Sequence, residues 1–201
     1  RKVQAGFEPL VSGFVRVPFD DLSAIEHVAA NNPNVVAVLF EPIQGEGGIN
    51  IAHDDYMRAL RRICDDKGWL FMVDEVQCGI GRTGAWFAHQ RAGIKPDVMT
   101  LAKGLGSGVP IGACLTAGKA AGVFHAGNHG STFGGNPLAT AVGYEVLDGV
   151  VRCEHFLVVR HADLEADAVR EGRLVPHGQR RGDICEVHLV GIPILARCRQ
   201  L

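Results

Sequence analysis

The stretch WLFMVDE, residues 69–75, decides the fold, because five apolar residues run without interruption into two acids. Such a run is typical of a strand that is buried on both faces of a parallel sheet. The stretch VVAVLFEP, residues 35–42, has the same form, and its apolar run ends at Glu41. We therefore predict two buried strands, each with a carboxylate at its carboxyl end.

A helix is predicted between these two strands. Apolar residues recur at helical spacing over residues 56–67, Asp54 or Asp55 can cap the start, and Gly68 stands where the helix would stop. Strand, helix and strand with short joints form a βαβ unit, which implies a parallel sheet of the α/β class.

The pattern continues through two further strands. Residues 98–102 form an apolar run that delivers Lys103 at its end, and residues 111–116 form another after the glycine-rich loop 104–108. A helix with proline in its first turn is expected from Pro137. The predicted architecture is a mostly parallel central sheet flanked by helices.

Three ionisable side chains, Glu41, Asp74 and Lys103, stand at the predicted carboxyl ends of strands, where ligands gather in open parallel sheets. Gln77 follows Asp74 by three residues. A cofactor of the pyridoxal kind needs an amine that bonds its aldehyde, an anion against its ring nitrogen and a donor for its phenolic oxygen. Lys103, Asp74 and Gln77 are of the three types required.

Plainer roles compete with this interpretation. Asp74 can cap the turn that follows it, because aspartate is common at such positions. Lys103 can be a strand-end lysine that reaches into water. Arg82 can bind a substrate carboxylate or brace a loop. The glycines around residue 106 can simply let the backbone turn tightly.

Four motifs occur along the chain in a fixed order. They are EPIQGEGG (41–48), DEVQCGIGRTG (74–84), KGLG (103–106) and HGSTFGGNP (129–137). Together they resemble class III aminotransferases, which depend on pyridoxal 5'-phosphate (PLP), and the resemblance covers roughly residues 1 to 150. The opening GFEPL (6–10) and the sequence of the fourth motif are most similar to the acetylornithine-type members. The resemblance implies the large domain of PLP-transferase fold type I.

The resemblance also implies roles for residues that touch the cofactor. Asp74 would pair with the pyridinium, Gln77 would contact the phenolic oxygen, and Lys103 would be bonded to the cofactor and move the proton. Thr132 would reach the cofactor phosphate of a neighbouring subunit, so a homodimer is expected.

Three further roles follow from the same resemblance. Ser131 would contact substrate, and Glu46 would be a gating acid that holds an arginine when a dicarboxylate enters. Glu41 would lie behind the residues that touch the ring.

The implied reaction is a two-stage amino transfer. N2-acetylornithine would give its δ-amino group and leave N-acetylglutamate 5-semialdehyde, and 2-oxoglutarate would take the amine to become glutamate, a step of arginine biosynthesis. Ornithine, succinylornithine or 4-aminobutyrate as the donor, a racemase of the same fold, and a non-catalytic PLP-binding remnant remain the alternatives.

Composition agrees with small-molecule chemistry. The 201 residues are 47% hydrophobic and 21% charged, and the formal net charge of -2 leaves no broad basic face for nucleic acid or an anionic membrane. No apolar run approaches the ~20 residues of a membrane span. Six widely spaced cysteines without a CxxC pair predict neither a metal site nor a disulfide framework, which fits a reducing cytoplasm.

Two sections of the chain are distinguished. Residues 1–150 are expected to be the central part of the PLP-binding large domain. Residues 151–201 form an unrecognisable tail, rich in arginine and without lysine, that is frame-shifted or divergent. The family's upstream phosphate-gripping loop, ring-stacking aromatic and carboxylate-binding arginine are not found here, and the C-terminal domain whose arginine partners the gating acid is not recognisable in the tail. We therefore expect a fragment with little or no transaminase activity alone.

Overall fold

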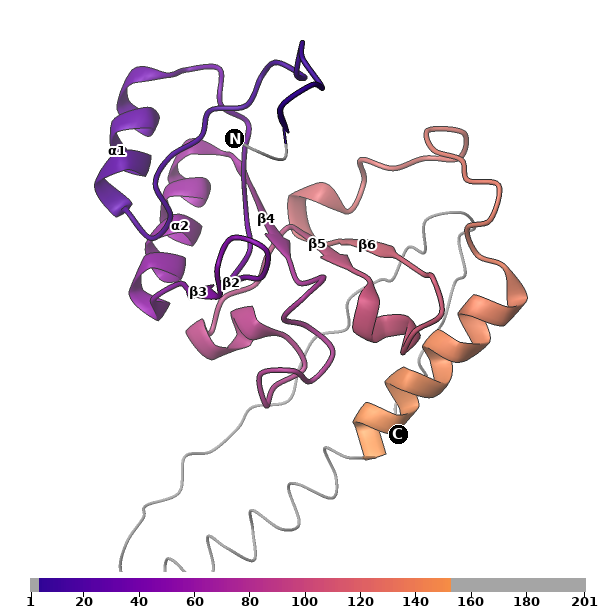
Figure 1. Ribbon diagram of the computed structural model, residues 1–201. Coiled ribbons are helices and arrows are strands. Elements are labelled where there is room, and N and C mark those ends of the chain that lie inside the picture. Colours follow the sequence, from indigo (N-terminus) through magenta and orange to yellow (C-terminus); the bar gives the residue numbers. More distant parts are fainter. Residues whose placement is uncertain (1–3, 153–201) are drawn as a thin grey trace, which may run out of the picture.

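A computed structural model describes residues 4–152 and contains a four-stranded sheet with helices beside it (Figure 1). The strands are β1 (Ala37–Phe40), β4 (Leu70–Asp74), β5 (Val98–Leu101) and β6 (Ala113–Thr116), and they lie side by side in that order. β1, β4 and β5 are parallel, whereas β6 runs antiparallel to β5. The mostly parallel α/β sheet is confirmed.

Helices α1 (Leu22–Asn31) and α2 (Asp54–Lys67) pack together on one side of the sheet. α2 buries Met57, Leu60 and Cys64 against Phe71 of β4, because these positions recur on one face of the helix. A third helix covers residues 137–152 and packs against β5 and β6 through Leu147. Helices therefore flank the sheet as predicted.

Short elements complete the described chain. β2 (Ile43–Gln44) and β3 (Asn50–Ile51) pair as a small antiparallel ribbon after β1. Three 3-10 turns follow β4, β5 and β6, and they are η2 (Ala88–Ala92), η3 (Lys103–Gly106) and η4 (Gly118–Ala120).

Two local predictions were wrong. The first strand is not buried on both faces, since β1 is an edge strand, Leu39 is 57% exposed and Val36 just before it is 74% exposed. Neither Asp54 nor Asp55 caps α2, because the helix begins two residues earlier than expected and His53 occupies the N-cap. Asp54 and Asp55 instead lie in the first turn, where a negative charge favours the helix dipole. Gly68 ends the helix in the left-handed conformation, as predicted.

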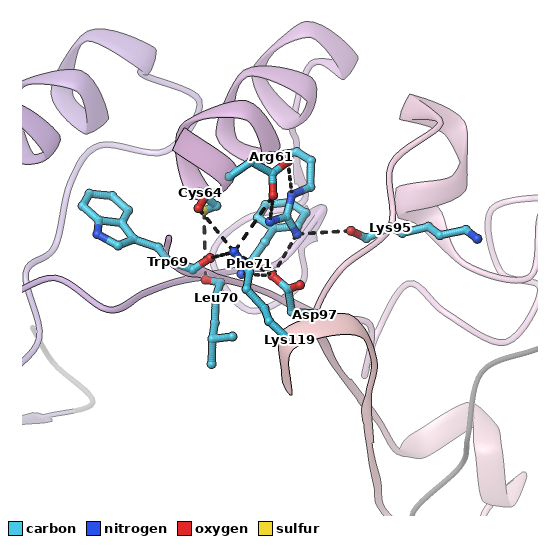
Figure 2. A network of polar contacts seen from close by, with 9 residues as sticks. Arg61, Cys64, Trp69, Leu70, Phe71, Lys95, Asp97 and Lys119 are labelled. Atoms are coloured by element: carbon cyan, nitrogen blue, oxygen red, sulfur yellow. Dashed lines mark hydrogen bonds and ion pairs between the residues drawn. The ribbon is translucent and has the colours of Figure 1, made fainter. Parts of the chain in front are cut away.

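The amino ends of β4 and β5 are tied to α2 by a partly buried network of polar contacts (Figure 2). Asp97 Oδ2 accepts hydrogen bonds from the Phe71 amide at 2.8 Å and from Arg61 Nη1 at 2.9 Å. Lys119 Nζ lies 3.9 Å from Asp97 Oδ2 and donates to the carbonyl oxygens of Trp69, at 2.5 Å, and Cys64. This network fixes the end of the sheet that is opposite to Asp74.

Candidate functional site

The sheet places three of the predicted site residues, Glu41, Asp74 and Lys103, at the carboxyl ends of neighbouring parallel strands. Phe40 pairs with Val73, so Glu41 comes directly after the strand beside β4. Asp74 pairs with Thr100, and Lys103 follows Thr100 by three residues. Because the strand order is β1, β4, β5, Asp74 lies on the middle strand with Glu41 on one side and Lys103 on the other. The predicted gathering of these residues beyond the carboxyl ends of parallel strands is confirmed.

Asp74 is half-buried at the end of β4. Its Oδ1 accepts a hydrogen bond of 2.9 Å from the Val76 amide, so the turn-capping role weighed from the sequence is present. Within residues 4–152 its Oδ2 has no hydrogen-bond partner. One oxygen therefore fixes the side chain, and the other is available to a ligand.

Lys103 begins η3 in an unusual backbone conformation. Its φ is 45°, in the left-handed region, and Ala102 before it is extended. Non-glycine residues avoid this region, and such strained residues cluster at active sites. The turn is closed by hydrogen bonds from the Leu105 amide to the Ala102 carbonyl oxygen and from the Ser107 amide to the Gly104 carbonyl oxygen. The side chain of Lys103 is exposed on this turn.

Gln77 lies against the glycine loop that follows β1. A Cβ at Gly45 would be only 2.3 Å from the side-chain amide of Gln77, so glycine at this position lets the Gln77 amide lie directly against the loop. The Gly45 amide also donates a 3.0 Å hydrogen bond to Glu41 Oε2. Glu41 thus fixes the loop that seats Gln77, whereas Glu46 is exposed in the same loop.

Arg82 lies against the turn that carries Lys103. A Cβ at Gly104 would be 3.3 Å from Arg82 Nε and 3.5 Å from the Cβ of Ile80. The loop after β4 therefore packs on the turn after β5, and this contact favours the loop-bracing interpretation of Arg82. A Cβ at Gly106 would be 2.7 Å from the Cγ2 of Ile111. These glycines therefore do allow close packing around the turn.

Ser131 and Thr132 are exposed in the loop between β6 and the helix over residues 137–152 (Figure 1). Ser131 Oγ accepts a hydrogen bond from the Gly134 amide at 3.0 Å. Ser131 lines an open cavity of about 470 Å³ beside β5 and β6, and neither Asp74 nor Lys103 lines it. The cavity does not mark the predicted site, and Thr132 makes no hydrogen bond within residues 4–152.

Sequence reasoning did not identify the partners of Glu75, which is the centre of a buried cluster. The residue is 1% exposed, and its carboxylate accepts hydrogen bonds from the amides of Ala88 and His89, from His89 Nδ1 and from Cys78 Sγ. Burial alone raises the pKa of Glu75, but the bonds from His89, Ala88 and Cys78 outweigh it and hold the pKa below its usual value. The acidic pair 74–75 was visible, but no sequence spacing pointed to its distant partners.

Cys64, Cys78 and Cys114 are free thiols. Cys64 and Cys78 are buried, as expected of small hydrophobic residues, and Cys114 is partly exposed. The other three cysteines, like most of the predicted tail, lie outside the described residues. Across residues 4–152 no cluster of His, Cys, Asp and Glu could hold a metal ion, and no helix is long and apolar enough to cross a membrane.

The comparisons with known proteins agree on one family. A family model described as "Aminotransferase class-III" matches residues 1–190. Acetylornithine aminotransferase of Nitrosomonas europaea is 66% identical over 148 residues, which are 74% of this chain and 38% of that protein. Acetylornithine aminotransferase 1 of Bordetella parapertussis is 58% identical over 149 residues, again 74% and 38%. This chain therefore spans well under half the length of these relatives.

Solved structures of aminotransferases also resemble this chain. The ornithine aminotransferase of Toxoplasma gondii, described with partial occupancy of PLP at its active site, superposes with a TM-score of 0.71 at 41% identity. The match covers 77% of this chain and 36% of that one. The acetylornithine aminotransferase of Elizabethkingia anophelis superposes with a TM-score of 0.67 at 40% identity and covers 75% and 38%.

Proposed function

The chain belongs to the class III aminotransferase family, and from this premise we propose that it is the central part of an acetylornithine aminotransferase. One observation carries the proposal. The ends of adjacent parallel strands hold a carboxylate, Asp74, and an amine, Lys103, while Gln77 is seated beside them by Gly45. These are the groups that a PLP site requires.

The residues present fit the cofactor. Asp74 has one oxygen held by Val76 and one without a partner in the described chain, which suits a charged pyridine nitrogen. Gln77 would hold the phenolic oxygen, and Lys103 would bond to the aldehyde. When bound, PLP would supply an electron sink for the pair released at the carbon that bears the donated amine.

The chain's own residues would then orient the reactants and move a proton. Lys103 Nζ would carry a proton between the carbon that bears the donated amine and the carbon that receives it. The free carboxylate oxygen of Asp74 would keep the ring nitrogen protonated. Glu41 would act at a distance, because its bond to the Gly45 amide holds the loop against Gln77.

We propose N2-acetylornithine as the amino donor and 2-oxoglutarate as the acceptor. The support is the 58–66% identity to relatives named acetylornithine aminotransferase. Similarity to an ornithine aminotransferase, at 41% identity, favours ornithine as the second candidate donor. Glu46 and Ser131 would contact the substrate, and both are exposed in loops that a substrate can reach.

The proposal includes a homodimer in a reducing cytoplasm. Thr132 is exposed in the loop before the helix over residues 137–152, which suits a contact with the cofactor phosphate of a partner subunit. The free thiols of Cys64, Cys78 and Cys114 suit a reducing compartment.

The test is to identify the residue that bonds to PLP. The purified chain is mixed with PLP, reduced with borohydride to fix any bonded cofactor, digested and analysed by mass spectrometry. We expect the cofactor on Lys103, no such product for Lys103→Ala, and an unchanged product for Lys67→Ala, which removes an exposed lysine from the end of α2. Labelling spread over several lysines, or retained in Lys103→Ala, would remove the assignment.

The donor is decided separately. Amine transfer from N2-acetylornithine, ornithine, succinylornithine and 4-aminobutyrate to 2-oxoglutarate is compared with the intact gene product. The proposal expects N2-acetylornithine to be the fastest donor. A clear preference for ornithine would favour the second candidate, and transfer from none of the four would favour a PLP-binding remnant.

A further inference from the structure

Glu75 lies between two residues assigned to the cofactor, Asp74 and Gln77, yet its own side chain points into the protein interior. Neighbouring residues of a strand point to opposite faces. Asp74 is half-buried at the carboxyl end of β4, whereas the side chain of Glu75 has no exposed surface. Glu75 can therefore reach neither the cofactor nor the substrate.

The carboxylate of Glu75 is fully occupied by the segment 78–89. Oε1 accepts from the His89 amide at 2.9 Å and from His89 Nδ1 at 2.9 Å. Oε2 accepts from the Ala88 amide at 3.0 Å and from Cys78 Sγ at 3.1 Å. A buried carboxylate with four donors is expensive to disturb, because removing its charge leaves donors that no water can satisfy.

The backbone of Glu75 is held from the other side. Its amide donates to the Thr100 carbonyl oxygen at 3.0 Å, and its carbonyl oxygen accepts from the Gly79 amide at 2.8 Å. Thr100 lies on β5, three residues before Lys103. One residue thus joins β5, the turn over residues 74–79 and the 3-10 helix η2.

We infer, on the premise of the proposed function, that Glu75 is a positioning residue for the cofactor site. By anchoring the turn 74–79 to η2, it sets where the Asp74 carboxylate and the Gln77 amide stand. Its action is exerted through these two neighbours, because its own oxygens are used by Ala88, His89 and Cys78.

A second buried carboxylate provides the matched control. Asp97 is 8% exposed, accepts from a backbone amide and from Arg61, and lies at the opposite end of the same strands (Figure 2). Asp97→Asn and Glu75→Gln each convert one buried carboxylate to the amide of equal shape. Both should lower the melting temperature, but only Glu75→Gln lies next to residues that hold the cofactor.

The experiment compares the PLP affinity and the backbone protection of the two variants. PLP binding is followed by absorbance, and hydrogen exchange of residues 74–79 is measured without PLP at temperatures equally far below each melting point. In metal sites, loss of a supporting partner behind the ligands lowers affinity roughly 10–100-fold, and we expect about tenfold weaker PLP binding for Glu75→Gln. Asp97→Asn should keep the affinity within about twofold.

The outcomes separate this inference from the proposed function. If wild type binds no PLP at Lys103, the proposed function fails, while faster exchange of residues 74–79 in Glu75→Gln than in Asp97→Asn still supports the positioning role. If wild type binds PLP and the two variants match in affinity and exchange, the positioning role is wrong. Should Glu75→Gln not fold, His89→Ala removes one donor and keeps the carboxylate, and the same comparison with Asp97→Asn applies, with a smaller expected difference.

Discussion

Replacement of Gly45 tests most directly the contact between the loop after β1 and Gln77 in the loop after β4. Gly45→Ala places a Cβ 2.3 Å from the Gln77 amide, so Gln77 must move away from the position it now has. We expect about tenfold weaker PLP binding, which corresponds to roughly 1.4 kcal/mol. Titration of PLP by absorbance measures the change.

Gly122→Ala is the matched control for this substitution, because a Cβ at Gly122 meets nothing within 4 Å. It should leave PLP affinity unaltered. A double variant with Gln77→Ala removes the obstacle, so adding Gly45→Ala to Gln77→Ala should cost little further affinity. An additional tenfold loss in the double variant would mean that Gly45 acts on something other than Gln77.

The buried thiols should be chemically inert. Burial raises the pKa of Cys64 to about 11, and burial together with the adjacent Glu75 carboxylate raises the pKa of Cys78 well above its ordinary value. At pH 8 the thiolate fraction of Cys64 is then about 0.1%, against about 10% for a thiol with the ordinary pKa of 9.0. Alkylation at pH 8, mapped by peptide mass spectrometry, should spare Cys64 and Cys78 in the folded chain and modify both in denaturant. Equal rates in the two conditions would contradict this picture.

The sequence predicted residues whose chemistry depends on position along a strand. Asp74 and Lys103 each follow an apolar run, and parallel pairing brings such ends together by necessity. The contact of Gly45 with Gln77 and the partners of Glu75 escaped prediction, because the first joins two loops and the second include a residue 14 positions away. Contacts of this kind depend on the folded path of the chain and have no local signature.

At the scale of elements, the predicted strands and helices occur with boundaries shifted by one or two residues. The residues 69–73 and 98–102 were expected, and β4 and β5 cover Leu70–Asp74 and Val98–Leu101. The direction of a strand was harder to predict than its existence, because an apolar run looks alike in a parallel and an antiparallel strand. In the structure β6 is antiparallel to β5. The exposure of β1 was also not predictable, since burial depends on what packs beside the edge of the sheet.

The end of α2 offers an element-scale prediction. Gly68 has a φ of 70°, and its amide closes the helix on the carbonyl oxygens of Asp65 and Cys64. An alanine there must adopt a left-handed conformation, so Gly68→Ala should destabilise the chain by about 1 kcal/mol in urea unfolding. Gly68→Asn should lose less, because asparagine tolerates this conformation. Equal stability of Gly68→Ala and wild type would show that the helix end can rearrange at no cost.

At the scale of the whole molecule, the described sheet is supported at both ends of its central strands and open at its sides. The network around Asp97 fixes the amino ends of the strands, and the cluster around Glu75 fixes the turn after β4. Among the described strands β1 and β6 each have one unpaired edge, and apolar side chains such as Leu39 face outward. The residues that we propose to hold the cofactor are thus supported from the protein interior, while their surroundings toward solvent remain open.

This openness leads to the last prediction, that the chain alone binds PLP yet transfers amines poorly. Lys103 is exposed on its turn, and Ser131 and Thr132 are exposed as well, so within the described chain water has access to the groups that we propose to react. Exclusion of water strengthens the electrostatic interactions on which such chemistry depends. In a single-turnover absorbance assay with PLP and N2-acetylornithine, we expect conversion of the cofactor to its amine form to be slow. The full-length acetylornithine aminotransferase of Nitrosomonas europaea serves as the active reference. Conversion by the chain at a rate near that of the reference would refute the prediction and mean that the strand ends alone suffice for the transfer.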